Sequence, residues 1–187
     1  MALGLWIGIA LVAFLVVIVL MALYYYNRFV VLENRIDNSA SQIDVQLKKR
    51  ADLVPNLVKT VKGYATHEKS IMDSVTKART ELLKGGSLDK KIKAGDQLQN
   101  ALKSLFALAE NYPQLRANEN FLQLQKELAN IEDRVAYARQ YYNDSVLEYE
   151  NATEQFPGVV FFNLYGKTKK EYLKIRENER ALPSVDF

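Results

Sequence analysis

The hydrophobic pattern of the chain begins with an apolar run, Leu3 to Leu23, that contains no charged side chain. A helix of that length spans about 30 Å, because each residue adds ~1.5 Å, and this is close to the hydrocarbon thickness of a bilayer. Aromatic side chains and a cation, which are expected at the headgroup level, follow at once: Tyr24, Tyr25, Tyr26 and Arg28. The pattern predicts a transmembrane anchor at residues 1–26, with these four residues at the membrane interface.

The distribution of Lys and Arg around this run predicts whether it is cleaved and how it is oriented in the membrane. A signal peptide carries Lys or Arg before a shorter apolar core, whereas the first cation here is Arg28. The run is therefore predicted to remain as an uncleaved, single-pass anchor. Because the basic residues all follow it, the positive-inside rule places the N-terminus outside and the bulk of the chain in the cytoplasm.

A second pattern, in which apolar and small residues recur every 3.6 positions on average, starts at Phe29 and continues in phase as far as Leu82. This is the period of a straight helix, and neither Gly nor Pro separates its start from the anchor. Pro55 lies inside the pattern and predicts a kink or a short break near Asp52 to Val54. The pattern as a whole predicts a helical rod from Asn27 to Lys84 that continues the anchor.

Two further helices are predicted after the glycine pair Gly85-Gly86, which ends the rod. The first runs from Leu88 to Tyr112 and the second from Glu119 to Phe156, with Ser87 and Asn118 as their N-caps. Apolar residues of the second helix follow a 3.5-residue period, which is typical of a coiled coil.

The last part of the chain, residues 157–187, is predicted to be a tail. An apolar patch, Val159 to Gly166, is followed by three lysines: Lys167, Lys169 and Lys170. If the two preceding helices run end to end, the tail returns to the bilayer, whereas a reversal at Pro113 keeps it away. The patch either lies in the membrane interface or packs against the end of the helices. Residues 182–187 are expected to be extended.

These elements predict an all-α protein in which an N-terminal transmembrane helix continues into an antiparallel bundle of long, coiled-coil-like helices. The predicted division is a transmembrane anchor at residues 1–26, a helical bundle at residues 27–156 and a C-terminal tail at residues 157–187.

Charge changes this picture mainly through its distribution. The net charge of +3 is too small to indicate nucleic-acid binding. However, residues 48–103 are predominantly basic and residues 119–156 predominantly acidic. The two segments either are ordinary solvated faces or attract one another, within one chain or between copies. The chain contains no Cys, which excludes disulfides and fits a reducing compartment.

Three groups of residues are candidates for contacts with lipid or protein. The spacing of Gly4 and Gly8 suits close packing of two membrane helices. A polar flank of the predicted rod either is its exposed side or contacts another copy of the chain; it contains Asn34, Asn38, Ser41, Lys49, Asp52, Asn56 and Lys59. A basic turn either is a solvated loop or binds anionic lipid or an acidic partner; it contains Lys84, Lys90, Lys91 and Lys93.

Residues with the spacing of a catalytic, metal or cofactor site are not found. His67 is the single histidine, and the sequence after it has Ile71 where a zinc-protease helix needs its second histidine. No glycine-rich phosphate loop follows a strand. We therefore expect a protein that is not an enzyme and has no metal, cofactor or nucleic acid.

Longer motifs permit comparison with known families: residues 26–28, 41–58, 62–65, 67–68, 109–113, 117–121 and 185–187. Through these motifs and its anchor the chain resembles the bacterial LemA family over nearly its whole length. The resemblance implies a helical cytoplasmic bundle on a single span of the bacterial cytoplasmic (inner) membrane, without an established enzymatic activity. It also implies a relation to a protein needed for building magnetosome membranes, and an association with membrane metalloproteases.

The leading interpretation is a non-enzymatic, self-assembling membrane scaffold that organises or remodels the membrane. A rod with a 3.6 period and a helix with a 3.5 period cannot share one seam along their whole length, so part of the stripe is predicted to remain for other copies. The alternative is an adaptor that docks a membrane protease or sensor through its cytoplasmic helices. The expected partners are membrane lipid, other copies of the chain and, for the adaptor, a membrane metalloprotease.

Overall fold

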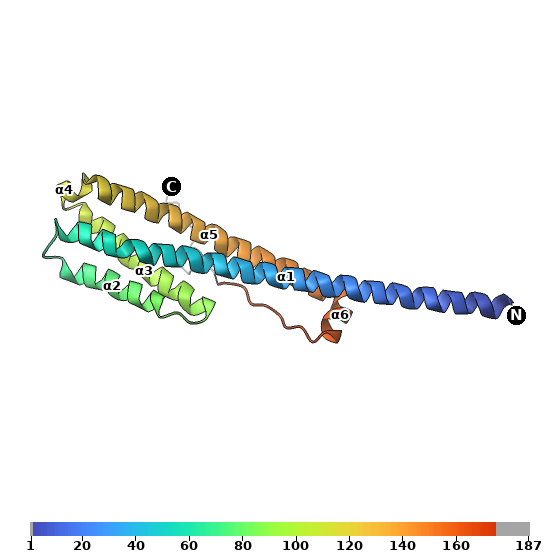
Figure 1. Cartoon of the computed structure of the whole chain (residues 1–187). Coiled ribbons are helices and arrows are strands. Elements are labelled where there is room, and N and C mark those ends of the chain that lie inside the picture. The colour runs from blue at the N-terminus through green and yellow to red at the C-terminus, as the bar shows by residue number, and fades with distance from the viewer. Residues whose placement is uncertain (1, 175–187) are drawn as a thin grey trace, which may run out of the picture. The chain divides into compact units, whose positions relative to one another are not determined.

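The computed structural model describes residues 2–174, and all regular secondary structure in this range is α-helical (Figure 1). The helices are α1 (Ala2–Lys62), α2 (Lys69–Leu83), α3 (Leu88–Ala109), α4 (Pro113–Arg116), α5 (Glu119–Glu154) and α6 (Gly158–Leu164). The all-α prediction, with a long apolar N-terminal helix, is confirmed. Residues 182–187, predicted to be extended, and the motif at 185–187 lie outside the described residues.

The chain forms two compact units. The anchor unit combines the described parts of residues 1–38 and 142–187, and the bundle unit consists of residues 39–141. Helices α1 and α5 each contribute residues to both units. The division into anchor, bundle and tail at residues 26 and 156 stays a prediction.

Helix α1 continues without interruption from the apolar run through Tyr24 to Asn27 and beyond, as predicted. Of the two alternatives predicted near Asp52 to Val54, the short break is wrong, because α1 also continues through Pro55, and the kink stays a prediction. A proline removes the N–H that would bond the carbonyl four residues earlier. Here that carbonyl belongs to Ala51, and Nε of Arg79 donates to it at 2.8 Å. An arginine of α2 therefore supplies the hydrogen bond that Pro55 cannot make.

The break in the predicted rod lies further along, between Lys62 and Lys69. The last turn of α1 closes with hydrogen bonds from Gly63 N–H to Thr60 O and from Ala65 N–H to Val61 O. The prediction of one helix from Asn27 to Lys84 was therefore wrong. The stripe stays in phase across the break because both helices bury it in the same core, for example through Val61 and Val75.

The helices that follow α1 in the bundle unit reverse direction from one to the next along the chain. Gly85 and Gly86 adopt positive φ angles of 75° and 125° in the turn between α2 and α3. Ser87 occupies the N-cap position of α3, although its side chain makes no capping hydrogen bond. The Asn118 side chain does cap α5, since its Oδ1 accepts a hydrogen bond from the Phe121 N–H at 3.0 Å.

Helix α5 runs antiparallel to α3, because Asp96 pairs with Arg139 whereas Phe106 contacts Phe121. Pro113 therefore stands at a reversal of the chain. The sequence argument linked such a reversal to a tail that stays away from the membrane, and that link stays a prediction. It counted only the turn at Gly85-Gly86 before Pro113, whereas the chain also turns between Lys62 and Lys69.

Most of the stripe of α1 is buried within the chain from Phe29 to Val61, and none of it is exposed. Ala40 and Val58 are half-buried, and the other members have at most 5% of their surface exposed: Phe29, Leu32, Ile36, Ile43, Leu47, Ala51, Val54 and Val61. The prediction that part of this stripe remains for other copies was therefore wrong. It assumed one partner helix, whereas α2 and α3 also contact the bundle-unit part of α1, through Arg79–Ala51 and Gly95–Leu47.

Candidate functional site

The N-terminal part of α1 carries an exposed apolar surface. Every large apolar side chain from Leu3 to Leu20 is exposed, with fractions from 40% at Ile18 to 75% at Leu3. By length and composition this helix is able to cross a bilayer, and none of its most apolar 18-residue window is buried. The helix is consistent with a membrane anchor. Gly4 and Gly8 have nothing within 4 Å of an added Cβ, so their role in self-association stays a prediction.

An aromatic cluster surrounds α1 where the exposed run ends. The Tyr25 ring stacks on Phe161 of α6, with 5.3 Å between centroids and 13° between planes. Phe29, which is fully buried, contacts the rings of Tyr149 and Phe162 at 6.4 and 6.3 Å. Aromatic pairs at such separations contribute beyond the area they bury. The cluster attaches α6 and the end of α5 to the last turns of the apolar run (Figure 1).

Tyrosine hydroxyls in this cluster bond to backbone carbonyls. Tyr165 donates to the carbonyl of Ala22 at 2.7 Å. The Tyr149 hydroxyl lies 3.0 Å from the carbonyl of Thr168 and 3.3 Å from a carboxylate oxygen of Glu33. Burial, together with the nearby Glu33 carboxylate and its hydrogen bond, raises the pKa of Tyr149 to about 12. Tyr149 is therefore a neutral hydrogen-bond donor at physiological pH.

The C-terminal segment, residues 167–174, is held along α5 by side chains of α1 and α5. Asn143 binds the backbone of Leu173 twice, accepting from its N–H at 2.9 Å and donating to its carbonyl at 3.3 Å. Lys167 pairs with Glu33 at 2.6 Å, and the Tyr172 hydroxyl donates to Glu150 at 2.7 Å. The segment predicted as a tail is therefore packed as far as the described residues extend.

The apolar patch of that predicted tail forms the short helix α6, which the sequence reasoning missed. The predominantly apolar patch gives no clear period, so a helix cannot be distinguished from a strand or a loop. Phe161 is buried against the helix pair, which matches the interpretation that the patch packs against the helices.

The four predicted interface residues have different surroundings. Tyr24 and Tyr26 are 55% and 49% exposed, whereas Tyr25 is half-buried in the aromatic cluster. Arg28 is exposed and donates to the Tyr24 hydroxyl at 3.1 Å. Their contact with a membrane stays a prediction.

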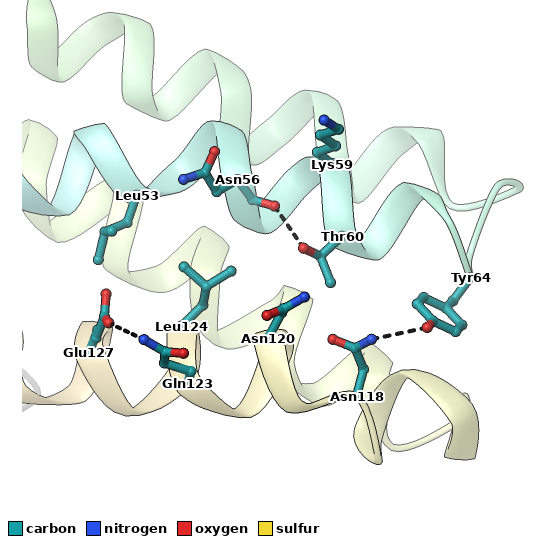
Figure 2. Close-up of a pocket in the computed structure, with 10 residues that line it drawn as sticks. All are labelled: Leu53, Asn56, Lys59, Thr60, Tyr64, Asn118, Asn120, Gln123, Leu124 and Glu127. Atoms are coloured by element: carbon teal, nitrogen blue, oxygen red, sulfur yellow. Dashed lines mark hydrogen bonds between the residues drawn. The ribbon is translucent and has the colours of Figure 1, made fainter.

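A polar groove lies between α1 and α5 in the bundle unit (Figure 2). Leu53 and Leu124 point into the space between the two helices, while amides and charges surround them. The Asn118 amide donates to the Tyr64 hydroxyl at 3.0 Å and closes one end. The hollow has a volume of about 630 Å³ and is lined by Leu53, Asn56, Lys59, Thr60, Tyr64, Asn118, Asn120, Gln123, Leu124 and Glu127.

Two more hollows, of about 440 and 320 Å³, continue this groove along the same helices. The first shares Leu53 and Glu127 with the hollow of Figure 2, and the second shares Gln46 and Arg134 with the first. Their other lining residues are Gln42, Lys49, Asp52, Asn130, Ile131, Tyr137, Ala138 and Tyr141. We call the three hollows together the α1/α5 groove. Sequence reasoning missed it, because it depends on the pairing of two helices far apart in the chain.

Part of the predicted polar flank lines this groove, namely Lys49, Asp52, Asn56 and Lys59. The other members, Asn34, Asn38 and Ser41, are exposed on α1 and are not among the lining residues. A contact between copies through any of these residues stays a prediction.

A buried arginine joins three helices of the bundle unit. Arg50 of α1 is 0% exposed and its guanidinium pairs with Glu132 of α5 and donates to the carbonyl of Gly95 in α3 at 3.3 Å. Gly95 allows this approach, because a Cβ there would lie 2.6 Å from Cδ2 of Leu47. The Arg50–Glu132 pair joins the basic and the acidic segment of the sequence within one chain.

Most cations of the predicted basic turn have carboxylate partners within the chain. Lys84 pairs with Glu81 at 2.6 Å, Lys93 with Asp89 at 2.9 Å, and Lys91 with Asp44. Lys90 lies against the glycine turn, close to Gly86. These internal pairs reduce the positive charge that the turn presents to an external partner.

His67 is exposed in the turn between α1 and α2. Within residues 2–174 no three His, Cys, Asp or Glu side chains come together as the ligands of a metal would.

Comparison with known proteins places these features in a family. The chain is 27% identical over 190 residues to magnetosome protein MamQ of Magnetospirillum gryphiswaldense, covering 88% of this chain and 68% of that protein. It is 27% identical over 175 residues to magnetosome protein MamQ 2 of Paramagnetospirillum magneticum, covering 80% and 64%. The chain thus spans about two thirds of the length of these relatives.

A third relative is Protein LemA of Metamycoplasma hominis, which is 26% identical over 113 residues, 59% of this chain and 51% of that protein. None of these names denotes a catalytic activity. The LemA family model matches residues 39–187, which include the whole bundle unit, α6 and the C-terminal segment. Since that match covers most of the chain, the protein belongs to the LemA family.

Proposed function

We propose that this protein is a non-enzymatic, self-assembling scaffold that is anchored in a membrane and organises or remodels it. The observation that carries the proposal is the continuity of α1, in which one helix contains both the exposed apolar run and a wall of the bundle. A protein that is merely attached to a membrane needs no such continuity. A scaffold does, because it must hold its assembly surface at a fixed place relative to the membrane. The magnetosome names of two relatives support a role connected with membranes.

The proposed location is the bacterial cytoplasmic (inner) membrane, with the N-terminus outside and the bundle in the cytoplasm. The supporting observation is that all Lys and Arg residues follow the apolar run, beginning with Arg28. Labelling of cysteines introduced singly at Ala2 and at Ser87 in whole cells tests this, because the chain has no other Cys. A membrane-impermeant reagent should modify only the first site.

We assign self-assembly to the α1/α5 groove. Its polar wall contains several amides, which both donate and accept hydrogen bonds, and its floor contains Leu53 and Leu124. A helix from another copy laid in this groove would bury those leucines and pair with the amides, as helix-in-groove contacts do. The stripe of α1 is already covered, so this groove replaces it as the assembly surface.

The size of the purified full-length protein in mild detergent tests this assignment. The unchanged chain should form large homomeric particles by light scattering. The double variant Asn56→Glu/Asn120→Glu adds charge on both walls of the groove at exposed positions and should give smaller particles. A matched control, Gln97→Glu/Asn100→Glu, adds the same charge on exposed positions of α3 outside the groove and should change nothing. A monomeric unchanged chain contradicts the scaffold proposal.

The alternative function, an adaptor for a membrane protease or sensor, is favoured by the same groove, which accepts a partner's helix as well as that of a copy. An adaptor should be monomeric alone and should lose one co-purifying protein in the Asn56→Glu/Asn120→Glu variant. The basic turn is tested separately by Lys90→Glu, since Lys91 and Lys93 already have carboxylate partners.

A further inference from the structure

Helix α6 has two unlike faces. Gly158 and Phe161 are buried on the face that packs against α1 and α5. On the other face Val160 and Leu164, one turn apart, are 54% and 70% exposed. Phe156, just before α6, is 84% exposed. A soluble helix usually places polar residues on such a face, so these exposed apolar side chains require an explanation.

The packed face locates α6 along α1. The stacked Tyr25–Phe161 pair and the bond from the Tyr165 hydroxyl to Ala22 both involve the turns of α1 where the apolar run ends. Helix α6 therefore lies at the level where the apolar run of α1 ends, and Tyr165 just after it contacts the ring of Tyr26 at 5.5 Å between centroids.

The charge distribution around α6 agrees with an apolar environment. No residue from Gly158 to Leu164 carries a charge, whereas three lysines follow. Lys167 and Lys169 pair with Glu33 and Glu154, and Lys170 comes directly after them. An apolar helix face followed by cations is typical of a segment that lies in the membrane interface.

We infer that the exposed face of α6 is a second membrane contact, in which Phe156, Val160 and Leu164 lie in the lipid interface. The inference rests on the proposed anchoring of α1 in a membrane. Such a face inserts about 5–10 Å into the boundary between headgroups and acyl chains. The aromatic cluster then joins two membrane contacts, one that spans the bilayer and one that lies on its surface.

Lipid fits this face better than a second copy of the chain. Helix α6 packs on the turns of α1 around Ala22 and Tyr25, and on those turns Leu23 and Tyr24 are themselves 57% and 55% exposed, in the surface that the bilayer covers in the proposed function. A stable contact between proteins buries roughly 1,200–2,000 Å² in total, far more than two side chains of a seven-residue helix and the neighbouring Phe156 provide.

The single tryptophan of the chain, Trp6, makes a direct test possible. In the full-length variant Trp6→Phe/Leu164→Trp the only tryptophan lies on α6. The variant is reconstituted in phosphatidylcholine vesicles with a minority of phosphatidylglycerol, containing lipids brominated either near the headgroup end or near the chain end. The control variant Trp6→Phe/Leu122→Trp carries the tryptophan at a position of α5 in the bundle unit that is 48% exposed.

The α6 tryptophan should emit further to the blue than the control and should be quenched most strongly by bromine near the headgroup end. Trp6 of the unchanged chain should be quenched as well, since it lies in the anchor. If Trp6 is quenched but the α6 tryptophan behaves like the control, the inference about α6 is overturned and the anchor stands.

If Trp6 itself is not quenched, the proposed anchoring fails, and the inference fails with it. The α6 tryptophan could instead emit in the blue without being quenched by brominated lipid, with a shift that increases with the protein-to-lipid ratio. That result would assign the face to a second copy, which also overturns the inference.

Discussion

The two units of this protein use different chemistry to hold the same pair of helices together. In the bundle unit the buried residues around α1 and α5 are almost all aliphatic, and the main polar link is the buried Arg50. In the anchor unit the cluster is rich in tyrosine and phenylalanine, and hydroxyl groups bond to backbone carbonyls of Ala22 and Thr168.

The difference follows from the surroundings proposed for each unit. Tyrosine has an apolar ring and a polar tip, which suits a boundary where one side is apolar and the other wet. An aliphatic core with an internal ion pair excludes water from the interior, which suits a unit that is surrounded by water. The aromatic region therefore fits the proposed membrane boundary, and the aliphatic core fits the unit to which the proposed assembly groove belongs.

The largest effect is expected in the bundle unit from Glu132→Ala. The variant leaves the fully buried guanidinium of Arg50 without its carboxylate and should lower the free energy of unfolding by about 3 kcal/mol. Chemical denaturation in detergent measures the loss, and hydrogen exchange should locate it in residues 39–141. The double variant Arg50→Met/Glu132→Met should recover much of the stability, because no charge is left buried. Equal losses in both variants would contradict this explanation.

The next effect should appear in the anchor unit with Gly158→Ala. A Cβ at Gly158 would overlap the carbonyl oxygen of Ala152 and lie 3.1 Å from Cε1 of Tyr25, so α6 must shift, at a cost of about 1–3 kcal/mol. Faster proteolysis or hydrogen exchange at α6 measures this.

A matched glycine in the bundle unit is the control. At Gly95 the added methyl group would meet the end of the Leu47 side chain, which is able to rotate, and the helix gains roughly 1 kcal/mol of propensity. Gly95→Ala should therefore be nearly neutral. A larger loss at Gly95 than at Gly158 would reverse the expected contrast between the units.

A smaller effect is expected from Tyr149→Phe, which removes the hydroxyl beside the Thr168 carbonyl and should cost about 1 kcal/mol. The same hydroxyl predicts a response to alkaline pH. The pKa of Tyr149 is about 12 in the folded chain and 10.0 for an ordinary tyrosine, so folding favours the protonated form. This contribution to stability is complete below about pH 10 and is lost as the pH rises through about 12.

Denaturation at several alkaline pH values measures that loss, and it should be smaller in Tyr149→Phe than in the unchanged chain. Tyr137→Phe is the control for the loss of a hydroxyl, since this tyrosine is 72% exposed and its replacement should leave the free energy of unfolding at neutral pH unchanged. If the free energy of unfolding of Tyr149→Phe depends on pH as it does in the unchanged chain, the Tyr149 hydroxyl is not the cause of the loss.

The smallest effect is expected from Glu148→Ala, which breaks the ion pair with Arg35. Both side chains are about half exposed, so the pair should contribute only about 0–1 kcal/mol, and less at high salt. A loss as large as that of Glu132→Ala would mean that the anchor unit also relies on ion pairs, and would remove the contrast between the units.

The local signals of the sequence were sufficient for much of the fold. Three of these signals depend only on the backbone and solvent close to them: the uncharged run before Tyr24, the glycine pair at residues 85–86 and the capping Asn118. Each of them therefore predicted an anchor, a turn or a helix start that the structure contains.

The misses concern features that depend on distant residues. The break after Lys62 was hidden because both helices keep one buried stripe in phase. The continuity through Pro55 depends on Arg79, a residue on another helix. The α1/α5 groove and the role of Tyr149 require the pairing of α1 with α5, which no local pattern reveals.

The pairing of α6 with the anchor also determines the order of events during synthesis. Tyr165 bonds to Ala22, 143 residues earlier in the chain. At about 5–20 residues per second, a ribosome takes on the order of ten seconds to make that interval. During that interval Tyr25 and Phe29 lack their aromatic partners on α5 and α6. The anchor unit closes only after α6 has been made, so a chain truncated before Gly158 would leave the Tyr25 ring without Phe161.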